Sequence, residues 1–171
     1  PAHNGKGAMQ GQEHKRNSGA ALSVVIPALD ATATLPAALA SVAWAAERLV
    51  IDGGSSDGTV PTAAALGARV VAAPRGRGTQ LAAGVAAASH DWLLLLHADT
   101  CLAPEAAAVA GAHMYDSSRA GYFRFALDST DRRARRLERL VAWRCRTLAL
   151  PYGDQGLLIH RDLLRAVGGI R

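Results

Sequence analysis

The sequence predicts an α/β protein, a three-layer sandwich in which a mainly parallel sheet lies between two layers of helices. Short runs of β-branched residues or leucine alternate with segments of helical spacing about ten residues long, which is typical of βαβ units. The strand-like runs are apolar at almost every position, as in WLLLL at 92–96, and this is expected of strands that helices cover on both faces. Half of the 171 residues are hydrophobic and 19% are charged, so the chain can bury the core of one domain.

The first 20 residues differ from the rest of the chain, because they are polar, rich in glycine and without any period. We interpret residues 1–20 as a mobile arm outside the fold. A single domain is therefore expected at residues 21–171.

The domain begins with a predicted strand and helix. The β-branched run at 22–27 predicts a buried strand. Helical spacing follows at 35–46, where Thr34 is available as the N-cap and Pro36 is tolerated in the first turn.

A second strand and helix follow directly. The run LVID predicts a strand at 49–52, and the glycine-rich segment 53–58 predicts a turn. A helix is expected from Thr59 to about residue 66, where Gly67 suits its C-terminal cap.

The same alternation continues to the end of the chain. Further strands are predicted at 69–73, 92–96, 121–127 and 156–160. Further helices are predicted at 79–89, at 104–115, in an arginine-rich segment ending near residue 148, and after residue 160.

Polar and glycine-rich segments follow each of the first four predicted strands. In a parallel sheet the carboxyl ends of the strands share one edge, and ligands bind in the crevice outside it. The segments that this rule brings to one crevice are 27–30, 52–59, 74–78 and 97–100. Their acids, glycines and two arginines suit a phosphate-bearing ligand, because glycine permits close backbone approach and arginine matches phosphate oxygens.

Ordinary structural roles stay open for several of these residues. Asp52 and the two glycines after it are also typical of a turn, and the segment 56–58 could simply begin a helix. Arg75 and Arg77 could lie in a solvated loop. A functional role is favoured more strongly for Asp99, because a carboxylate directly after a buried strand packs poorly. Oxygen ligands suit Mg²⁺ or Mn²⁺ bridging a diphosphate, whereas helix capping or a local ion pair is the alternative role of Asp99.

Four segments resemble, in their order along the chain, the signatures of family-2 glycosyltransferases. They are VVIPALDATATL at 24–35, LVIDGGSSDGT at 49–59, RGRGTQLAAG at 75–84 and DWLLLLHADT at 91–100. The later LPYGDQGLLIHRDLLRAVGGIR at 150–171 is similar to the short stand-alone branch of radical-SAM/selenodomain-associated transferases. The resemblance implies the Rossmann-like GT-A fold of nucleotide-diphospho-sugar transferases.

The resemblance also implies an activity. The enzyme would move a sugar from a nucleotide-sugar donor to an unidentified acceptor hydroxyl, with inversion and with the help of a divalent cation, Mn²⁺ or Mg²⁺. Pro27 and Asp30 would line the nucleotide pocket, and Asp52 would hydrogen-bond the base. Arg77 would lie near the diphosphate, and Asp99 resembles the last acid of the metal-binding Asp-x-Asp motif.

The acceptor side is implied by the Gly-Asp-Gln-Gly turn, in which Asp154 and Gln155 would face the acceptor. Family members usually continue to a Glu-Asp pair whose aspartate is the expected base, and the sequence ends at Arg171 before such a pair. We therefore expect a domain truncated at its C-terminus, with Asp154 as the remaining candidate for the catalytic base. The alternative is a catalytically impaired module that binds a nucleotide sugar or a glycan.

His97 departs from the family pattern, because most members have an acid at the first position of the metal motif. Imidazole can ligate Mn²⁺ or orient a water molecule. We therefore include His97 with Asp99 as a candidate metal ligand. A nucleotidyltransferase is disfavoured, because the first strand is not followed by a glycine-rich loop with arginine and lysine.

The basic charge is concentrated in one segment. The net charge is +5, and the segment 131–146 carries seven arginines against Asp131 and Glu138. A solvated helix face is one interpretation, and a surface for anionic phospholipid or an anionic acceptor is the other. Because the charge is local, we do not expect nucleic acid as a partner.

Cys101 and Cys145 lack metal or redox spacing and are expected to be free thiols in a reducing compartment. No apolar run approaches the roughly 18 residues that a membrane-spanning helix needs. The expected location is the cytoplasm, with peripheral contact at the inner face of the membrane through 131–146.

Overall fold

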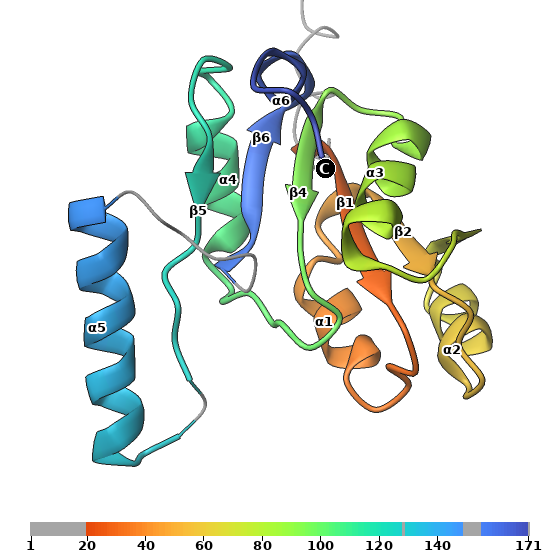
Figure 1. Ribbon diagram of the computed structural model, residues 1–171, viewed down its shortest axis with the longest axis horizontal. Coiled ribbons are helices and arrows are strands. Elements are labelled where there is room, and N and C mark those ends of the chain that lie inside the picture. The colour runs from red at the N-terminus through yellow and green to blue at the C-terminus, as the bar shows by residue number, and fades with distance from the viewer. Residues whose placement is uncertain (1–19, 128, 149–154, 171) are drawn as a thin grey trace, which may run out of the picture.

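The computed structural model describes residues 20–127, 129–148 and 155–170 of the chain (Figure 1). Its centre is a six-stranded sheet with the strand order β3-β2-β1-β4-β6-β5. The strands are β1 (Ala20–Ala28), β2 (Ala45–Asp52), β3 (Arg69–Ala72), β4 (Trp92–Leu95), β5 (Gly121–Tyr122) and β6 (Leu157–His160). The helices are α1 (Leu35–Ser41), α2 (Thr59–Ala65), α3 (Arg77–Ala87), α4 (Ala106–His113), α5 (Arg132–Leu148) and α6 (Arg161–Ala166).

Two apolar clusters cover the two faces of the sheet and make the three layers. Leu22, Val24 and Ile26 of β1 pack with side chains of α1, α2 and α4 on one face. Val25 of β1 packs with β2, β4 and side chains of α3 and α6 on the other face. Successive residues of a strand point to opposite faces, so the apolar run of β1 serves both clusters. The prediction of an α/β fold with a mostly parallel, doubly covered sheet is confirmed.

The strand register brings the predicted site segments to one edge. β1 pairs in parallel with β2, with Ala28 opposite Asp52, and in parallel with β4, with Val25 opposite Leu95. The segments that follow these three strands therefore leave the sheet side by side.

Three predicted extents are wrong, because the strand predicted at 49–52 also begins earlier, at Ala45. The helix predicted at 35–46 ends at Ser41, because residues from Ala45 onward pair with β1 as the beginning of β2. This pairing outweighs the intrinsic helical preference of the alanines. The strand predicted at 121–127 is confined to Gly121–Tyr122. The Phe123 amide still donates to the Gln155 carbonyl beside β6, but by Leu127 the backbone amide donates to Glu138 of α5 and not to a strand.

β6 reverses the direction of the sheet, since it pairs antiparallel with both β4 and β5. Beyond β5, Figure 1 shows α5 standing apart from the other helices at this edge of the sheet. The inward side of α5 is buried and consists of Ala134, Glu138, Val141 and Cys145. Glu138 accepts hydrogen bonds from the Leu127 amide at 2.8 Å and from Arg135 Nη1 at 2.6 Å, which ties α5 to the preceding segment. The pKa of Glu138 is lowered, first of all by the bond from Leu127.

Within the described part of the chain, no helix combines the length and apolar character needed to cross a bilayer.

Candidate functional site

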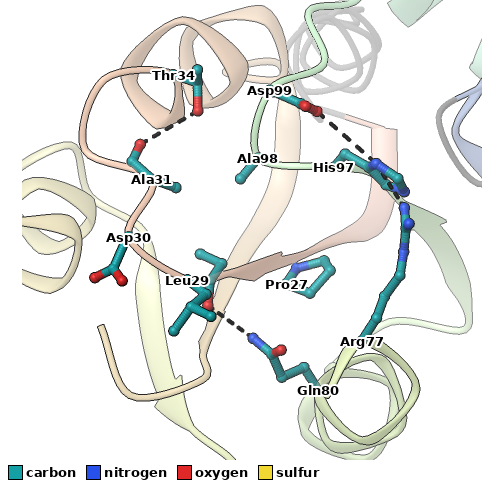
Figure 2. Close-up of a pocket in the computed structure, with 11 residues that line it drawn as sticks. Pro27, Leu29, Asp30, Ala31, Thr34, Arg77, Gln80, His97, Ala98 and Asp99 are labelled. Atoms are coloured by element: carbon teal, nitrogen blue, oxygen red, sulfur yellow. Dashed lines mark hydrogen bonds and ion pairs between the residues drawn. The ribbon is translucent and has the colours of Figure 1, made fainter. Parts of the chain in front are cut away.

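A pocket of about 360 Å³ opens at the carboxyl ends of β1 and β4 (Figure 2). The residues that line it come from the β1–α1 turn, from α3 and from the segment after β4. They are Pro27, Ala28, Leu29, Asp30, Ala31, Thr34, Arg77, Gln80, His97, Ala98 and Asp99. Five residues singled out from the sequence thus meet here, namely Pro27, Asp30, Arg77, His97 and Asp99.

Three neighbouring side chains, Arg77, His97 and Asp99, form the charged side of the pocket. Arg77 Nη2 lies 2.6 Å from His97 Nδ1, and His97 Nδ1 lies 4.0 Å from Asp99 Oδ1 (Figure 2). The side chain of Asp99 is 70% exposed, whereas that of His97 is 21% exposed. The pocket therefore offers an accessible carboxylate at its rim and a guanidinium that is hydrogen-bonded to the imidazole.

Gln80 lines the same pocket and was not singled out from the sequence. Its side-chain amide is buried, and Nε2 donates to the carbonyls of Ala28 at 2.8 Å and Ile51 at 2.7 Å. Its Oε1 accepts from the Gly76 amide at 3.4 Å. Gln80 thus joins the ends of β1 and β2 to the turn that begins α3. A sequence signal existed, because Gln80 is one turn after Arg77 in a helix that is otherwise rich in alanine.

Asp30 shapes the wall of the pocket through the backbone. It has φ of 48°, the left-handed conformation that a residue other than glycine rarely adopts. Its amide donates to Ser55 Oγ at 2.9 Å, and its Oδ1 accepts from the Ser56 amide at 2.8 Å. Its carboxylate points away from the middle of the pocket in Figure 2. The side chain therefore joins the β1–α1 turn to the loop after β2.

Asp52 lies outside the set of pocket-lining residues and is 7% exposed. Its Oδ2 accepts from the amides of Gly54 at 3.0 Å and Ser55 at 3.1 Å, so the carboxylate closes a turn. Nearby, Asp57 accepts from Thr59 and from the Thr32 amide. The pKa of Asp57 is far below the usual 3.8, chiefly because of the hydrogen bond from Thr59. These carboxylates rigidify the loop beside the pocket.

Gln155, which was predicted for the acceptor side, is not among the residues that line this pocket. Gln155 is buried, with Oε1 accepting from Cys145 Sγ at 3.2 Å and Nε2 donating to the Phe123 carbonyl at 3.3 Å. Its amide thus connects α5 to the segment after β5. Asp154 lies outside the described residues.

The pocket fits a divalent cation only if the ligand supplies part of the coordination. Among the side chains that the structure describes, no three acids, histidines or cysteines gather as a metal site. Mg²⁺ and Mn²⁺ in phosphate-binding enzymes are held by one or two carboxylates together with phosphate oxygens and water. The exposed Asp99 at the pocket rim matches the protein's share of such a site.

Comparisons with known proteins agree with this architecture. The sequence profile of glycosyl transferase family 2 matches residues 23–159. Uncharacterised glycosyltransferases of Mycobacterium tuberculosis and Mycobacterium bovis are 41% identical over 83 residues, which is 48% of this chain and 38% of theirs.

Solved structures give a longer match. Glucosyl-3-phosphoglycerate synthase of Mycobacterium tuberculosis in complex with uridine diphosphate (UDP) superposes with a TM-score of 0.63 and 26% identity, over 84% of this chain and 57% of that enzyme. The same enzyme with Mn²⁺, UDP-glucose and phosphoglyceric acid matches at a TM-score of 0.62 and 24% identity, a likeness of fold alone. The chain thus spans well under two thirds of the length of these relatives.

Proposed function

Since the chain belongs to glycosyl transferase family 2, we propose that it binds a nucleotide-sugar donor and transfers the sugar to an acceptor hydroxyl. The observation that carries this proposal is the pocket at the carboxyl ends of β1 and β4, where Arg77 and Asp99 face one space. A solved relative of the same fold, 26% identical, holds UDP. UDP is therefore the first ligand to test.

The roles that we propose for the pocket residues follow from the chemistry of a leaving diphosphate. The reaction develops negative charge on the diphosphate, and preorganised cationic groups lower the barrier by stabilising that charge. Arg77 is the cation that the described residues place at this pocket. Pro27 and Asp30 would border the nucleotide, with Asp30 acting through the turn that its carboxylate holds.

The divalent cation would be held by Asp99, with His97 as the second candidate ligand. When bound, the ion would supply Lewis-acid stabilisation of the leaving diphosphate. Asp52 would hydrogen-bond the base with the carboxylate lone pairs that the Gly54 and Ser55 amides leave unused.

Inversion at the sugar is proposed for the transfer step, with the acceptor oxygen attacking in line with the departing diphosphate. This step needs a base within hydrogen-bond reach of the acceptor hydroxyl. Asp154 remains the proposed base, and Gln155 would support that side by anchoring α5. We also propose membership of the radical-SAM/selenodomain-associated branch, on the resemblance at 150–171.

The outer face of α5 supports a proposed peripheral position at an anionic, cytoplasmic membrane face. Leu137, Leu140 and Trp143 are 46%, 59% and 56% exposed. On a helical wheel these side chains share a face with Arg133 and Arg136, both exposed, and α5 stands clear of the sheet (Figure 1). Arginine attracts anionic headgroups, while leucine and tryptophan insert at the interface, so this face suits an anionic bilayer.

The experiment that tests donor binding measures the melting temperature with UDP and Mn²⁺. At UDP concentrations about 100 times Kd, we expect a rise of roughly 5–10 °C. Asp99→Asn should weaken UDP affinity in Mn²⁺ by about tenfold or more, because the amide is a poor ligand for the ion. The matched control is Asp162→Asn. Asp162 also follows a histidine by two residues, but it lies in α6, which begins at the end of the strands opposite the pocket.

The outcomes separate the two functions considered. Absence of any shift with UDP and the other nucleoside diphosphates would contradict the proposal. Saturable binding of UDP-sugars with neither hydrolysis nor transfer would instead support a module that only binds nucleotide sugars.

A further inference from the structure

The contact between Arg77 and His97 crosses the pocket from the first turn of α3 to the segment after β4. Arg77 Nη2 lies 2.6 Å from His97 Nδ1. A guanidinium has five N–H donors and no acceptor, so the imidazole must present the lone pair of Nδ1 in this contact. The contact therefore assigns to His97 the tautomer in which Nδ1 accepts and Nε2 carries the proton.

This contact competes with metal binding at the same atom. Nδ1 is also the ring nitrogen that faces Asp99, at 4.0 Å from Oδ1. A cation held jointly by Nδ1 and Asp99 would need the lone pair that now accepts from Arg77. Coordination through Nδ1 and the bond to Arg77 therefore exclude each other.

Holding Arg77 in place has a direct benefit for binding an anion. An arginine side chain loses rotamer freedom when it binds a ligand, and a group that already fixes its orientation reduces that cost. The bond to His97 uses one of the five N–H groups and leaves the planar fork able to meet two phosphate oxygens.

We propose that His97 is a positioning residue that holds the Arg77 guanidinium toward the donor's diphosphate, so that part of diphosphate binding is independent of the divalent cation. The proposal rests on the donor site described under the proposed function. It assigns to the histidine of the His-x-Asp motif an arginine-orienting role instead of a metal-ligating one. The ligand class is a nucleoside diphosphate, and the contact that carries the proposal is the Arg77–His97 hydrogen bond.

The test is UDP binding by titration calorimetry in EDTA, with no divalent cation present. Arg77→Ala and His97→Ala should each weaken UDP binding by about tenfold, and the double variant should be no weaker than Arg77→Ala within about twofold. His97→Asn should retain the wild-type affinity within about threefold, because its Oδ1 can accept from Arg77 near the place of Nδ1. His160→Ala is the control and should leave the UDP affinity unchanged. Like His97, His160 precedes an aspartate by two residues, but it pairs with Trp92 at the end of the strands opposite the pocket.

A second readout needs no ligand. The ¹⁵N shifts of the His97 ring should report a proton on Nε2 and none on Nδ1, and Arg77→Ala should move the Nδ1 resonance. A proton on Nδ1 in the wild type would overturn the proposal.

Two results of the UDP titrations would also overturn the proposed role of His97. One is a His97→Ala effect that occurs with Mn²⁺ and vanishes in EDTA, since that pattern belongs to a metal ligand. The other is additive losses in the double variant, since these belong to two independent contacts. If the wild type binds no nucleoside diphosphate at all, the proposed function fails, and the ring shifts still decide whether His97 holds Arg77.

Discussion

Gly84 of α3 packs directly on Val25 of β1, so closely that a Cβ at Gly84 would overlap Val25 Cγ1. The same Cβ would come within 2.9 Å of Ile51 Cγ1 on β2. α3 therefore lies closer to the sheet than any side chain at this position would permit. This approach places the first turn of α3, with Arg77 and Gln80, over the ends of β1 and β2.

Gly84→Ala should destabilise the protein by about 1–3 kcal/mol, because the added methyl group overlaps the side chains of β1 and β2. It should also weaken UDP binding, since α3 must shift away from the sheet and carry Arg77 with it. The control is Gly111→Ala in α4, where an added Cβ meets nothing within 4 Å. That change should be neutral or raise stability by up to about 1 kcal/mol. Thermal unfolding of the two variants checks the prediction, and equal effects would contradict it.

Gln80→Leu should lower both stability and UDP affinity. Leucine fills a similar volume but donates to neither Ala28 nor Ile51, and the loss of these two buried hydrogen bonds costs about 1–3 kcal/mol. Without this bridge the ends of β1 and β2 lose their connection to the Gly76 turn. Calorimetric titration with UDP, done well below the melting temperature, separates the two effects.

Ser23→Ala is the comparison for Gln80→Leu. Ser23 is fully buried, yet its hydroxyl binds Glu47 near the edge of the sheet opposite the pocket. The Ser23→Ala variant should be less stable than the wild type and should bind UDP with unchanged affinity. Loss of UDP affinity in both variants would show that the Gln80 effect is only a general loss of stability.

Glu47 makes stability depend on pH. Burial raises its pKa, but hydrogen bonds from Ser23 and Ser89 and the charge of Arg69 outweigh burial, so the pKa lies below the usual 4.5. A carboxyl whose folded pKa is lowered stabilises the fold fully above its unfolded pKa, and this contribution disappears as pH falls through the folded value.

Glu47→Gln should therefore be less stable than the wild type at pH 7, and the difference should shrink as pH falls below about 4.5. Melting temperatures of both proteins from pH 7 to pH 3 measure this. A difference that is constant over this range would contradict the role of the charge.

The triple variant Arg132→Gln/Arg133→Gln/Arg136→Gln should lose binding to vesicles that contain phosphatidylserine. Each arginine near an anionic surface contributes about 1 kcal/mol, so the three together should weaken binding by roughly 100-fold. Vesicle sedimentation checks the loss, and added salt should weaken wild-type binding in the same way. Arg165→Gln on α6, where the arginine is 70% exposed, is the control. Equal wild-type binding to purely neutral vesicles would contradict an electrostatic surface.

Periodicity predicted the architecture well where strands are central. The runs that became β1 and β4 are apolar because both faces are covered, and their parallel direction follows from the βαβ alternation. The predictions at 35–46 and 121–127 were wrong in extent because alanine and mixed segments carry little local preference. Pairing of Ala45 onward with β1 decided the first boundary, and the hydrogen bond from the Leu127 amide to Glu138 directs the second segment to α5.

The sequence by itself determined which segments lie at the carboxyl ends of the strands, because strand direction follows from connectivity. These segments indicated Arg77, His97 and Asp99 as neighbours. Only the tertiary structure decided what each polar group does there. Asp30 and Asp52 bind loop amides, Gln80 bridges two strands, and His97 accepts from Arg77. The physical reason is that a hydrogen bond depends on distances of a few tenths of an ångström between residues far apart in the chain, and spacing along the sequence carries no such information.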